Sequence, residues 1–209
     1  MPIDLSKSLD DLLKEMEWDK DKAAEIRFGD VSALRANEYG HFKYEIGEQP
    51  IVPRSERFAQ FIGTKYDAAL FLESRLFLTK NPFWYLVENA WMWGNEKDEY
   101  KAIELECYFA PKGFLIVVKD RGKGFDVAEV VRKQNAGKKY FQNGGGAFSL
   151  MKKEQTCTYS YSKKGNEAYI LCLTANAQNA DKTKILQTSL SPVYFPQILD
   201  TPTNTEAKS

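Results

Sequence analysis

Three short segments, in a fixed order along the chain, constrain its fold more than any other feature. The first is an apolar stretch from Pro82 to Gly94, the second runs from Asp120 to Phe125, and the third runs from Gly144 to Leu150. The first segment has helical periodicity, the second follows a run typical of a buried strand, and the third resembles the start of a helix. This order indicates a chain of mixed α and β structure.

Asn89 lies beside an apolar stripe in the first segment. Pro82 suits the first turn of a helix and Gly94 suits its end. The stripe has helical spacing and consists of Phe83, Leu86, Val87, Ala90 and Trp93. The neutral amide oxygen of Asn89 can complete the octahedral oxygen shell of a Mg²⁺ ion that nucleotide phosphates already hold. An amide bonded to a neighbouring loop is the alternative interpretation.

Asp120 follows the apolar run from Phe114 to Val118, which is predicted to be a buried strand. A carboxylate at such a strand end can accept a hydrogen bond from the exocyclic amino group of adenine, a group that guanine lacks at that position. Gly122 and Gly124 allow the backbone to approach a ligand closely. A simple turn after a strand would use the same residue types.

The third segment begins with Gly144, Gly145 and Gly146, followed by Ala147. Glycines before a helix expose backbone N–H groups at the positive end of the helix dipole, where phosphate oxygens bind well. The stretch before it is rich in Lys, Asn and Gly, as expected of a mobile cover over a charged ligand. Its basic residues either pair with a triphosphate or form a solvated face; they are Arg132, Lys133, Lys138 and Lys139.

Together, these segments resemble the nucleotide site of the GHKL (histidine kinase-like) ATPase superfamily. The Asn89 segment resembles the N box, residues 120–125 the first glycine box, and residues 144–150 the second. The chain looks most similar to the branch of stand-alone anti-sigma factors and serine-protein kinases, because of its Gly-x-Gly-x-Phe-x-Leu motif at residues 144–150 and because it shows no dimerisation-phosphoacceptor domain. The motif Leu-Val-Glu-Asn-Ala at residues 86–90, by contrast, is more similar to one class of sensor kinases. The resemblance covers roughly residues 45 to 175.

The resemblance implies a Bergerat ATP-binding fold, an α+β two-layer sandwich with a mostly antiparallel sheet packed on helices. It implies a protein that binds ATP with Mg²⁺ and acts as a regulator, and whose kinase version transfers the γ-phosphate to Ser or Thr of a protein partner. Asn89 would contact the metal through the nucleotide phosphates. The residues expected to bind ATP are Asn89, Asp120, Gly122, Gly124, Phe125, Lys138, Gly144, Gly145, Gly146 and Ala147.

Tyr85 is the main departure from the family pattern. Anti-sigma kinases carry a Glu that serves as general base at this position, four residues before the Asn. A positioned base contributes roughly 10²- to 10⁴-fold in rate, so its loss would reduce turnover and leave nucleotide binding intact. Glu88 is expected to point about 100° away from Asn89 around the helix axis. Trp93 stands where the family usually has a His. Because these positions lack the residues of the family pattern, no residue is assigned a catalytic role.

Two alternatives to a protein kinase or ATPase therefore stay open. One is a non-catalytic, nucleotide-dependent switch, a pseudokinase. The other is the catalytic domain of a split histidine kinase that acts on a separate protein. A complete self-phosphorylating sensor kinase is disfavoured, because the single histidine, His41, lies in a segment typical of a turn and strand.

Composition limits the classes of partner. Lys plus Arg and Asp plus Glu number 29 each, so net charge gives no reason to expect nucleic acid or an anionic membrane. No apolar run is long enough to span a bilayer. Cys107, Cys157 and Cys172 lack metal-ligand spacing and are interpreted as core cysteines of a reducing compartment, which predicts a cytoplasmic protein. A protein partner, a regulator or sigma-type factor, is expected, and a homodimer is an alternative.

The predicted organisation has three parts. Residues 1–44 form a helical extension with an edge strand, 45–175 the ATPase domain, and 176–209 a tail that is partly disordered. The N-terminal helix, capped by Ser8 and Asp11, either packs on the domain or offers a dimer or partner surface. The tail contains a short apolar patch at residues 192–199, which is either laid on the body or binds a partner. Further elements are expected at 42–46, 55–79, 103–109, 155–162 and 168–174.

Overall fold

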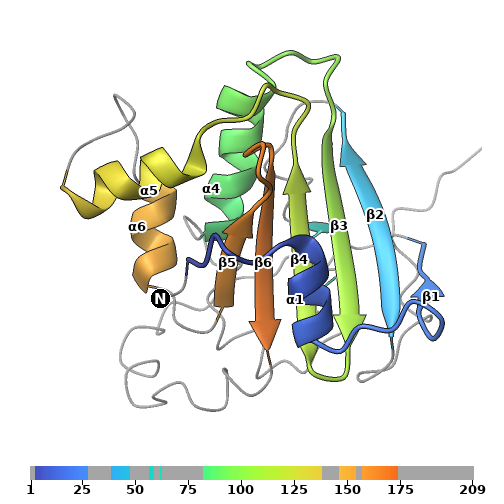
Figure 1. Ribbon diagram of the computed structural model, residues 1–209. Helices are drawn as coiled ribbons and strands as arrows, with labels where there is room; N and C mark the ends of the chain where they lie inside the picture. Colours follow the sequence, from blue (N-terminus) through green and yellow to red (C-terminus); the bar gives the residue numbers. More distant parts are fainter. Residues whose placement is uncertain are drawn as a thin grey trace, which may run out of the picture.

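The computed structural model describes residues 3–27, 39–47, 57–58, 62, 82–137, 146–153 and 157–173. Within these residues, six strands form one sheet in the order β1-β2-β3-β4-β6-β5 (Figure 1). Their bounds are β1 Ala24–Glu25, β2 Gly40–Ile46, β3 Ile103–Ala110, β4 Gly113–Lys119, β5 Cys157–Tyr161 and β6 Glu167–Leu173. With helices packed against this sheet, the chain has an α+β fold, as predicted.

The sheet is mixed, which corrects the expectation of a mostly antiparallel sheet. Strands β1 and β2 pair in parallel, with Ala24 opposite Gly40, while the four other pairings are antiparallel. The sequence offered no sign of β1, because two residues are too few to show a period. The segment 42–46, expected to be an edge strand, is therefore an inner strand of the described sheet.

One face of the sheet packs on helices α4 (Pro82–Asn89), α5 (Val127–Asn135) and α6 (Gly146–Lys153). Strand β4 sends Phe114, Ile116 and Val118 into this core and Leu115 and Val117 to the other face. All five are buried, because both faces are covered. This confirms the buried strand predicted ahead of Asp120.

The opposite face is covered by α1 (Leu9–Glu15), drawn in dark blue in Figure 1. The predicted cap is present: the Ser8 hydroxyl accepts the Asp11 N–H at 3.2 Å, and the Asp11 carboxylate accepts the Ser8 N–H at 2.9 Å. Leu12 and Met16 are both 0% exposed in a second core on this face. The N-terminal helix thus packs on the domain, and the two-layer expectation is corrected by helices on both faces.

The stretch expected to be a cover contains helix α5, whose first turn is capped by Asp126. Arg132 and Lys133 pair with Glu129 on this helix, at 2.7 Å and 3.2 Å. The helical spacing of these residues explains why they pair with a carboxylate of their own element. Lys138, Lys139, Gly144 and Gly145 lie outside the described residues.

Two other predicted regions are described only in part or not at all. Of the helices expected at 55–79, only residues 57–58 and 62 are described; they are helical, and Phe58 and Ile62 are buried. The tail at 176–209 lies outside the described residues. The boundary expected between residues 44 and 45 falls inside β2.

The cysteine prediction is corrected for two of the three residues. Cys157 and Cys172 lie directly opposite each other on β5 and β6, with Cα atoms 4.5 Å apart, and form a disulfide. That separation suits a bridge between paired strands. Cys107 is free and buried, as expected of a core cysteine. Among the described helices, none has the length and apolar character needed to cross a membrane.

Candidate functional site

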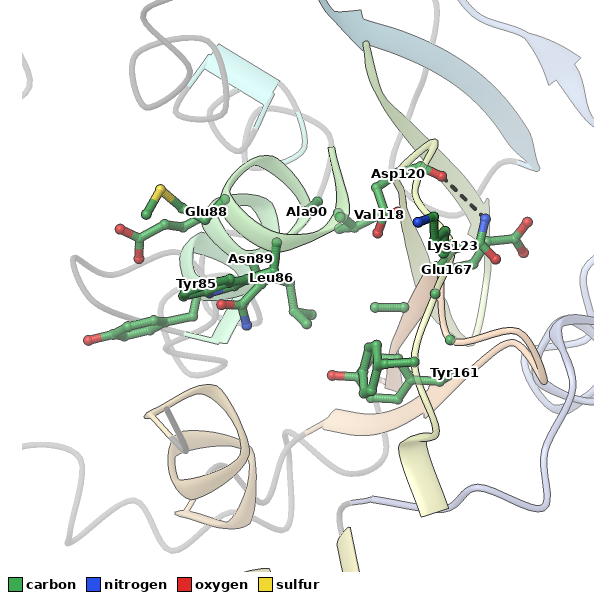
Figure 2. Close-up of a pocket in the computed structure, with 18 of the residues that line it drawn as sticks. Tyr85, Leu86, Glu88, Asn89, Ala90, Val118, Asp120, Lys123, Tyr161 and Glu167 are labelled. Atoms are coloured by element: carbon green, nitrogen blue, oxygen red, sulfur yellow. Dashed lines mark hydrogen bonds between the residues drawn. The ribbon is translucent and has the colours of Figure 1, made fainter. Parts of the chain in front are cut away.

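A cavity of about 600 Å³ opens between α4 and the end of the sheet at which β4 finishes and β6 starts (Figure 2). Asn89 and Asp120 both line it, although they come from different elements and are far apart in sequence. The lining also includes Lys123, Gly124 and Phe125 from the loop after β4, and Gly165 and Asn166 from the turn before β6. All three sequence segments thus reach one cavity, the third through Phe148.

Asn89 is the last residue of α4, and its side chain lies on the cavity side of the helix in Figure 2. Within the described part of the chain, its amide makes no hydrogen bond. Buried and half-buried amides that have structural roles are normally hydrogen-bonded. The amide of Asn89 is therefore available to a ligand.

The helix changes to a π-helical turn, η1 (Ala90–Gly94), directly after Asn89. The Asn95 N–H donates to the Ala90 carbonyl at 2.7 Å, which closes this wider turn. Trp93, predicted to belong to the apolar stripe, is 58% exposed. The wider turn explains this, because it rotates Trp93 away from the face that Phe83 and Leu86 share.

The π-turn brings the helix end into direct contact with the loop after β4. A Cβ atom on Gly94 would lie 2.3 Å from Cγ of Asp120, and one on Gly122 would lie 2.1 Å from the Gly94 carbonyl oxygen. Neither position has room for a side chain. Gly122, predicted to contact the nucleotide, thus serves here to let the loop pack on η1.

Asp120 is held from several sides. Its Oδ1 accepts the Gly122 N–H at 2.8 Å, while its backbone N–H donates to the Asn166 carbonyl at 3.0 Å. The Asn166 amide donates to the Asp120 carbonyl at 3.2 Å. Burial raises the pKa of Asp120, although the Gly122 N–H and the charge of Lys164 act in the opposite direction. Oδ2 has no hydrogen-bond partner in the described residues, so it can accept a donor from a ligand.

Asn95 holds the loop after β4 in place, a role that the sequence did not predict. Its side chain is 0% exposed and donates to the Lys101 and Ala102 carbonyls, at 2.7 Å and 3.3 Å. Its Oδ1 accepts the Arg121 N–H at 2.8 Å. An Asn after a Gly is typical of any turn, so the sequence carried no signal for this role.

Aromatic side chains form the apolar end of the cavity. Tyr161 stacks on Phe148 with ring centroids 5.7 Å apart, and Phe125 meets Tyr161 edge-on at 5.8 Å. Gly124 next to Phe125 has φ +77°, and a Cβ there would lie 1.9 Å from the Lys164 carbonyl oxygen, so a glycine is needed. Such a wall suits a planar, partly apolar ligand.

The structure thus gathers Asn89, Asp120, Gly124 and Phe125 around one cavity, with Gly122 behind it. The third segment is described from Gly146 onward: Gly146 and Ala147 begin α6, which packs on α4 and supplies Phe148 to the lining. The remaining predicted ATP contacts, Lys138, Gly144 and Gly145, are not among the described residues.

In the described residues, no group of three or more His, Cys, Asp or Glu side chains could hold a metal ion. A metal at Asn89 would thus need most of its ligands from a bound molecule, which is the role that nucleotide phosphates play for Mg²⁺. In comparisons with protein-family models and with curated protein sequences, nothing matches this chain.

Proposed function

We propose that this chain is a Mg²⁺–ATP-binding regulatory protein with a Bergerat-type fold, similar to anti-sigma factors and serine-protein kinases. One observation carries the proposal. Asn89 and Asp120 line a single cavity and present an unbonded amide and an unbonded carboxylate oxygen to it. These are the two groups that the resemblance to GHKL ATPases assigns to metal and adenine.

The proposed roles follow from the chemistry of each group. Oδ2 of Asp120 accepts a hydrogen bond from the adenine amino group, and the aromatic wall with Phe125 packs against the base. Asn89 supplies an oxygen to Mg²⁺, which the phosphates hold. The N–H groups at the start of α6, at Gly146 and Ala147, donate to the triphosphate. Lys138, Gly144 and Gly145 keep the contacts that the resemblance implies for them.

The proposal extends to the setting of this activity. A protein partner, a regulator or sigma-type factor, responds to the nucleotide state or receives the γ-phosphate on a Ser or Thr. In that case catalysis would consist mainly of positioning and of charge neutralisation by Mg²⁺, in line with a loose phosphoryl-transfer transition state. The cytoplasm is the compartment proposed from the sequence, and the Cys157–Cys172 disulfide is the feature that argues against it.

Isothermal titration calorimetry with ATP, in the presence of Mg²⁺ or of EDTA, tests the binding proposal. We expect binding in the micromolar range that weakens on removal of Mg²⁺ and with Asn89→Ala. Because Asn89 acts through the metal, EDTA should weaken the variant less than the wild type. An equal loss in both proteins would rule out Asn89 as a metal ligand, and absence of binding to the wild type would refute the proposed function.

Tyr85 favours a second candidate, a nucleotide switch without catalysis. It lines the cavity one helical turn before Asn89, where the resemblance places the general base. The chain thus carries a phenol where the resembled kinases carry a carboxylate. Radiolabelled [γ-³²P]ATP separates the two candidates, since a switch would bind the label and release neither phosphate nor a labelled protein.

A further inference from the structure

A second cavity, of about 560 Å³, lies beside the first one. Lys123, Gly124, Phe125 and Tyr161 line both cavities and so form a shared wall. The second cavity is also lined by the first turn of α5 and by residues 162–164, which follow β5. An occupant of the second cavity therefore contacts the same loop that borders the proposed nucleotide site.

Three lysines from two different loops surround this second cavity. Lys123 follows β4, while Lys163 and Lys164 lie between β5 and β6, and all three are exposed. In the described part of the chain none of the three forms an ion pair, in contrast to Lys43, which pairs with Glu106 at 3.0 Å. Like charges repel, so three unpaired lysines at one cavity indicate a negatively charged ligand.

Asp126 supplies a carboxylate to the lining, but this group already has a structural role. Its Oδ1 accepts the Glu129 N–H at 2.9 Å and thereby caps α5. Its charge offsets one lysine and leaves the cavity positive, in a chain whose 29 basic and 29 acidic residues balance. The positive charge is therefore a local feature of this cavity and not a consequence of composition.

Backbone contacts hold the two lysine-bearing loops together. The Phe125 N–H donates to the Lys164 carbonyl at 3.1 Å. Gly165 has φ +78°, and a Cβ atom there would lie 2.2 Å from the Phe125 carbonyl oxygen, so this close approach needs a glycine. The backbone of the lysines is thus in place before a ligand binds, which lowers the entropy cost of binding.

The same cavity also offers apolar surface, from Leu5, Phe125, Val127 and Tyr161. Leu5 is 36% exposed, so part of this surface faces solvent. A small inorganic anion would use the lysine charges alone. A protein segment in which an apolar side chain is flanked by carboxylates would use both the charges and the apolar surface.

We propose that the second cavity is the docking site for an acidic segment of the protein partner. The segment packs an apolar side chain against Leu5 and directs its Asp or Glu carboxylates to the three lysines. The inference rests on the proposed function in that the proposed function supplies the partner. Exposed ion pairs are individually weak, so the lysines mainly steer and select the segment while the apolar contact adds affinity.

Selection from a phage-displayed library of random peptides, with the full chain as bait, tests the docking site. The wild type should enrich peptides that combine Asp or Glu with an apolar residue. A fluorescein-labelled copy of an enriched peptide should bind in fluorescence anisotropy, and more weakly as NaCl rises, because salt screens exposed charges. The triple variant Lys123→Glu, Lys163→Glu, Lys164→Glu should weaken binding roughly tenfold or more.

The matched control carries Lys14→Glu, Lys20→Glu and Lys97→Glu, at three exposed lysines outside both cavity linings. It changes the net charge by the same amount and should bind the peptide as the wild type does. Circular dichroism melts show whether each variant is folded. Lys163→Glu alone, at an exposed position, should still weaken binding roughly two- to fivefold.

Leu5→Ala tests the apolar part of the site and should weaken binding roughly three- to tenfold, because buried apolar surface is lost. Equal loss of affinity in the two triple variants would overturn the proposal, since net charge alone would then explain binding. Enrichment of peptides without acidic residues would overturn it too. If calorimetry shows that inorganic phosphate binds the wild type and not the Lys123, Lys163 and Lys164 variant, while no acidic peptide is enriched, the cavity is a small-anion site and the docking proposal is refuted.

The outcomes also separate docking from the proposed function. A wild-type chain that binds the acidic peptide but no ATP refutes the proposed nucleotide function and leaves the docking site in place. A wild-type chain that binds Mg²⁺–ATP but enriches no acidic peptide refutes the docking site alone.

Discussion

The two carboxylate oxygens of Asp120 have different surroundings, and this difference divides structure from function within one residue. Oδ1 is engaged by the Gly122 N–H. Oδ2 lies on the side of Gly94, where a Cβ atom would come within 2.5 Å of it. One oxygen fixes the rotamer and the other stays available to a ligand.

Asp120→Asn should separate stability from binding. The raised pKa of Asp120 means that its ionised form is disfavoured in the folded state, so this cost is present at neutral pH and disappears below the unfolded pKa of about 4. The variant should thus unfold at equal or higher temperature than the wild type at pH 7, with the difference vanishing near pH 3. Differential scanning calorimetry across this range measures it.

The same variant should bind ATP roughly 10- to 100-fold more weakly, because the new NH₂ group faces the adenine amino group and a charged acceptor is lost. Titration calorimetry at pH 7 measures the affinity. Unchanged affinity would show that the adenine does not contact Asp120.

At the scale of elements, the junction of η1 with the loop after β4 depends on Gly94. Gly94→Ala should push the Asp120 carboxylate aside, since no room exists for the methyl group. We expect a loss of roughly 1–3 kcal/mol in unfolding free energy, typical of overpacking, and at least tenfold weaker ATP binding. Urea denaturation and calorimetry check both.

Gly47→Ala is the control for this substitution, because nothing lies within 4 Å of a Cβ there and its φ is not in the left-handed region. It should change stability by less than about 1 kcal/mol and leave ATP affinity unchanged. Equal effects of the two substitutions would mean that the contact with Asp120 is unimportant.

The pairing of β2 with β3 gives a second prediction at this scale. Glu106 accepts Tyr108 OH at 2.7 Å and Lys43 Nζ at 3.0 Å and lies 3.1 Å from His41 Nε2. The hydrogen bond with His41, followed by those with Tyr108 and Lys43, lowers the pKa of Glu106 from 4.5 to about 2. A lowered carboxyl pKa stabilises the fold above the unfolded value and is lost as the pH falls toward the folded one.

The wild type should therefore lose on the order of 2 kcal/mol between pH 5 and pH 2 through this residue, and Glu106→Gln should lack that part of the loss. Urea unfolding at stepped pH measures it. Glu129→Gln is the comparison: the pKa of Glu129 is also about 2, but its ion pairs lie at the surface of α5, where solvent screens them. Its removal should change the pH dependence less.

Elements with a clear period could be predicted from the sequence, while features set by pairing could not. The apolar spacing from Phe83 to Ala90 was enough to predict α4, but nothing in it signals the π-turn that places Gly94 against Asp120. Likewise, both cysteine strands were expected, but their register was not, so the Cys157–Cys172 bridge was missed. Long-range partners decide such features, and local patterns do not encode them.

At the scale of the whole molecule, α1 packs on the face of the sheet opposite to the one that faces the cavity. Its Leu12 and Met16 pack with Tyr108, Leu115 and Tyr169 on the outer face of β3, β4 and β6. Residues on β4 alternate between this second core and the core beneath α4. The two cores therefore share strands β3, β4 and β6, which couple the N-terminal segment to the site.

Leu12→Ala tests whether this coupling makes one cooperative unit. Leu12 is 0% exposed, so the truncation should cost about 2–5 kcal/mol of unfolding free energy, as in other cores. Because β4 belongs to both cores, far-UV circular dichroism and tryptophan fluorescence should still report a single, coincident transition at lower urea. Leu5→Ala, at a 36% exposed position, should change stability by less than about 1 kcal/mol. If Leu12→Ala instead released α1 in a separate early transition while the rest kept wild-type stability, the N-terminal helix would be an appendage available to a partner and not part of the fold.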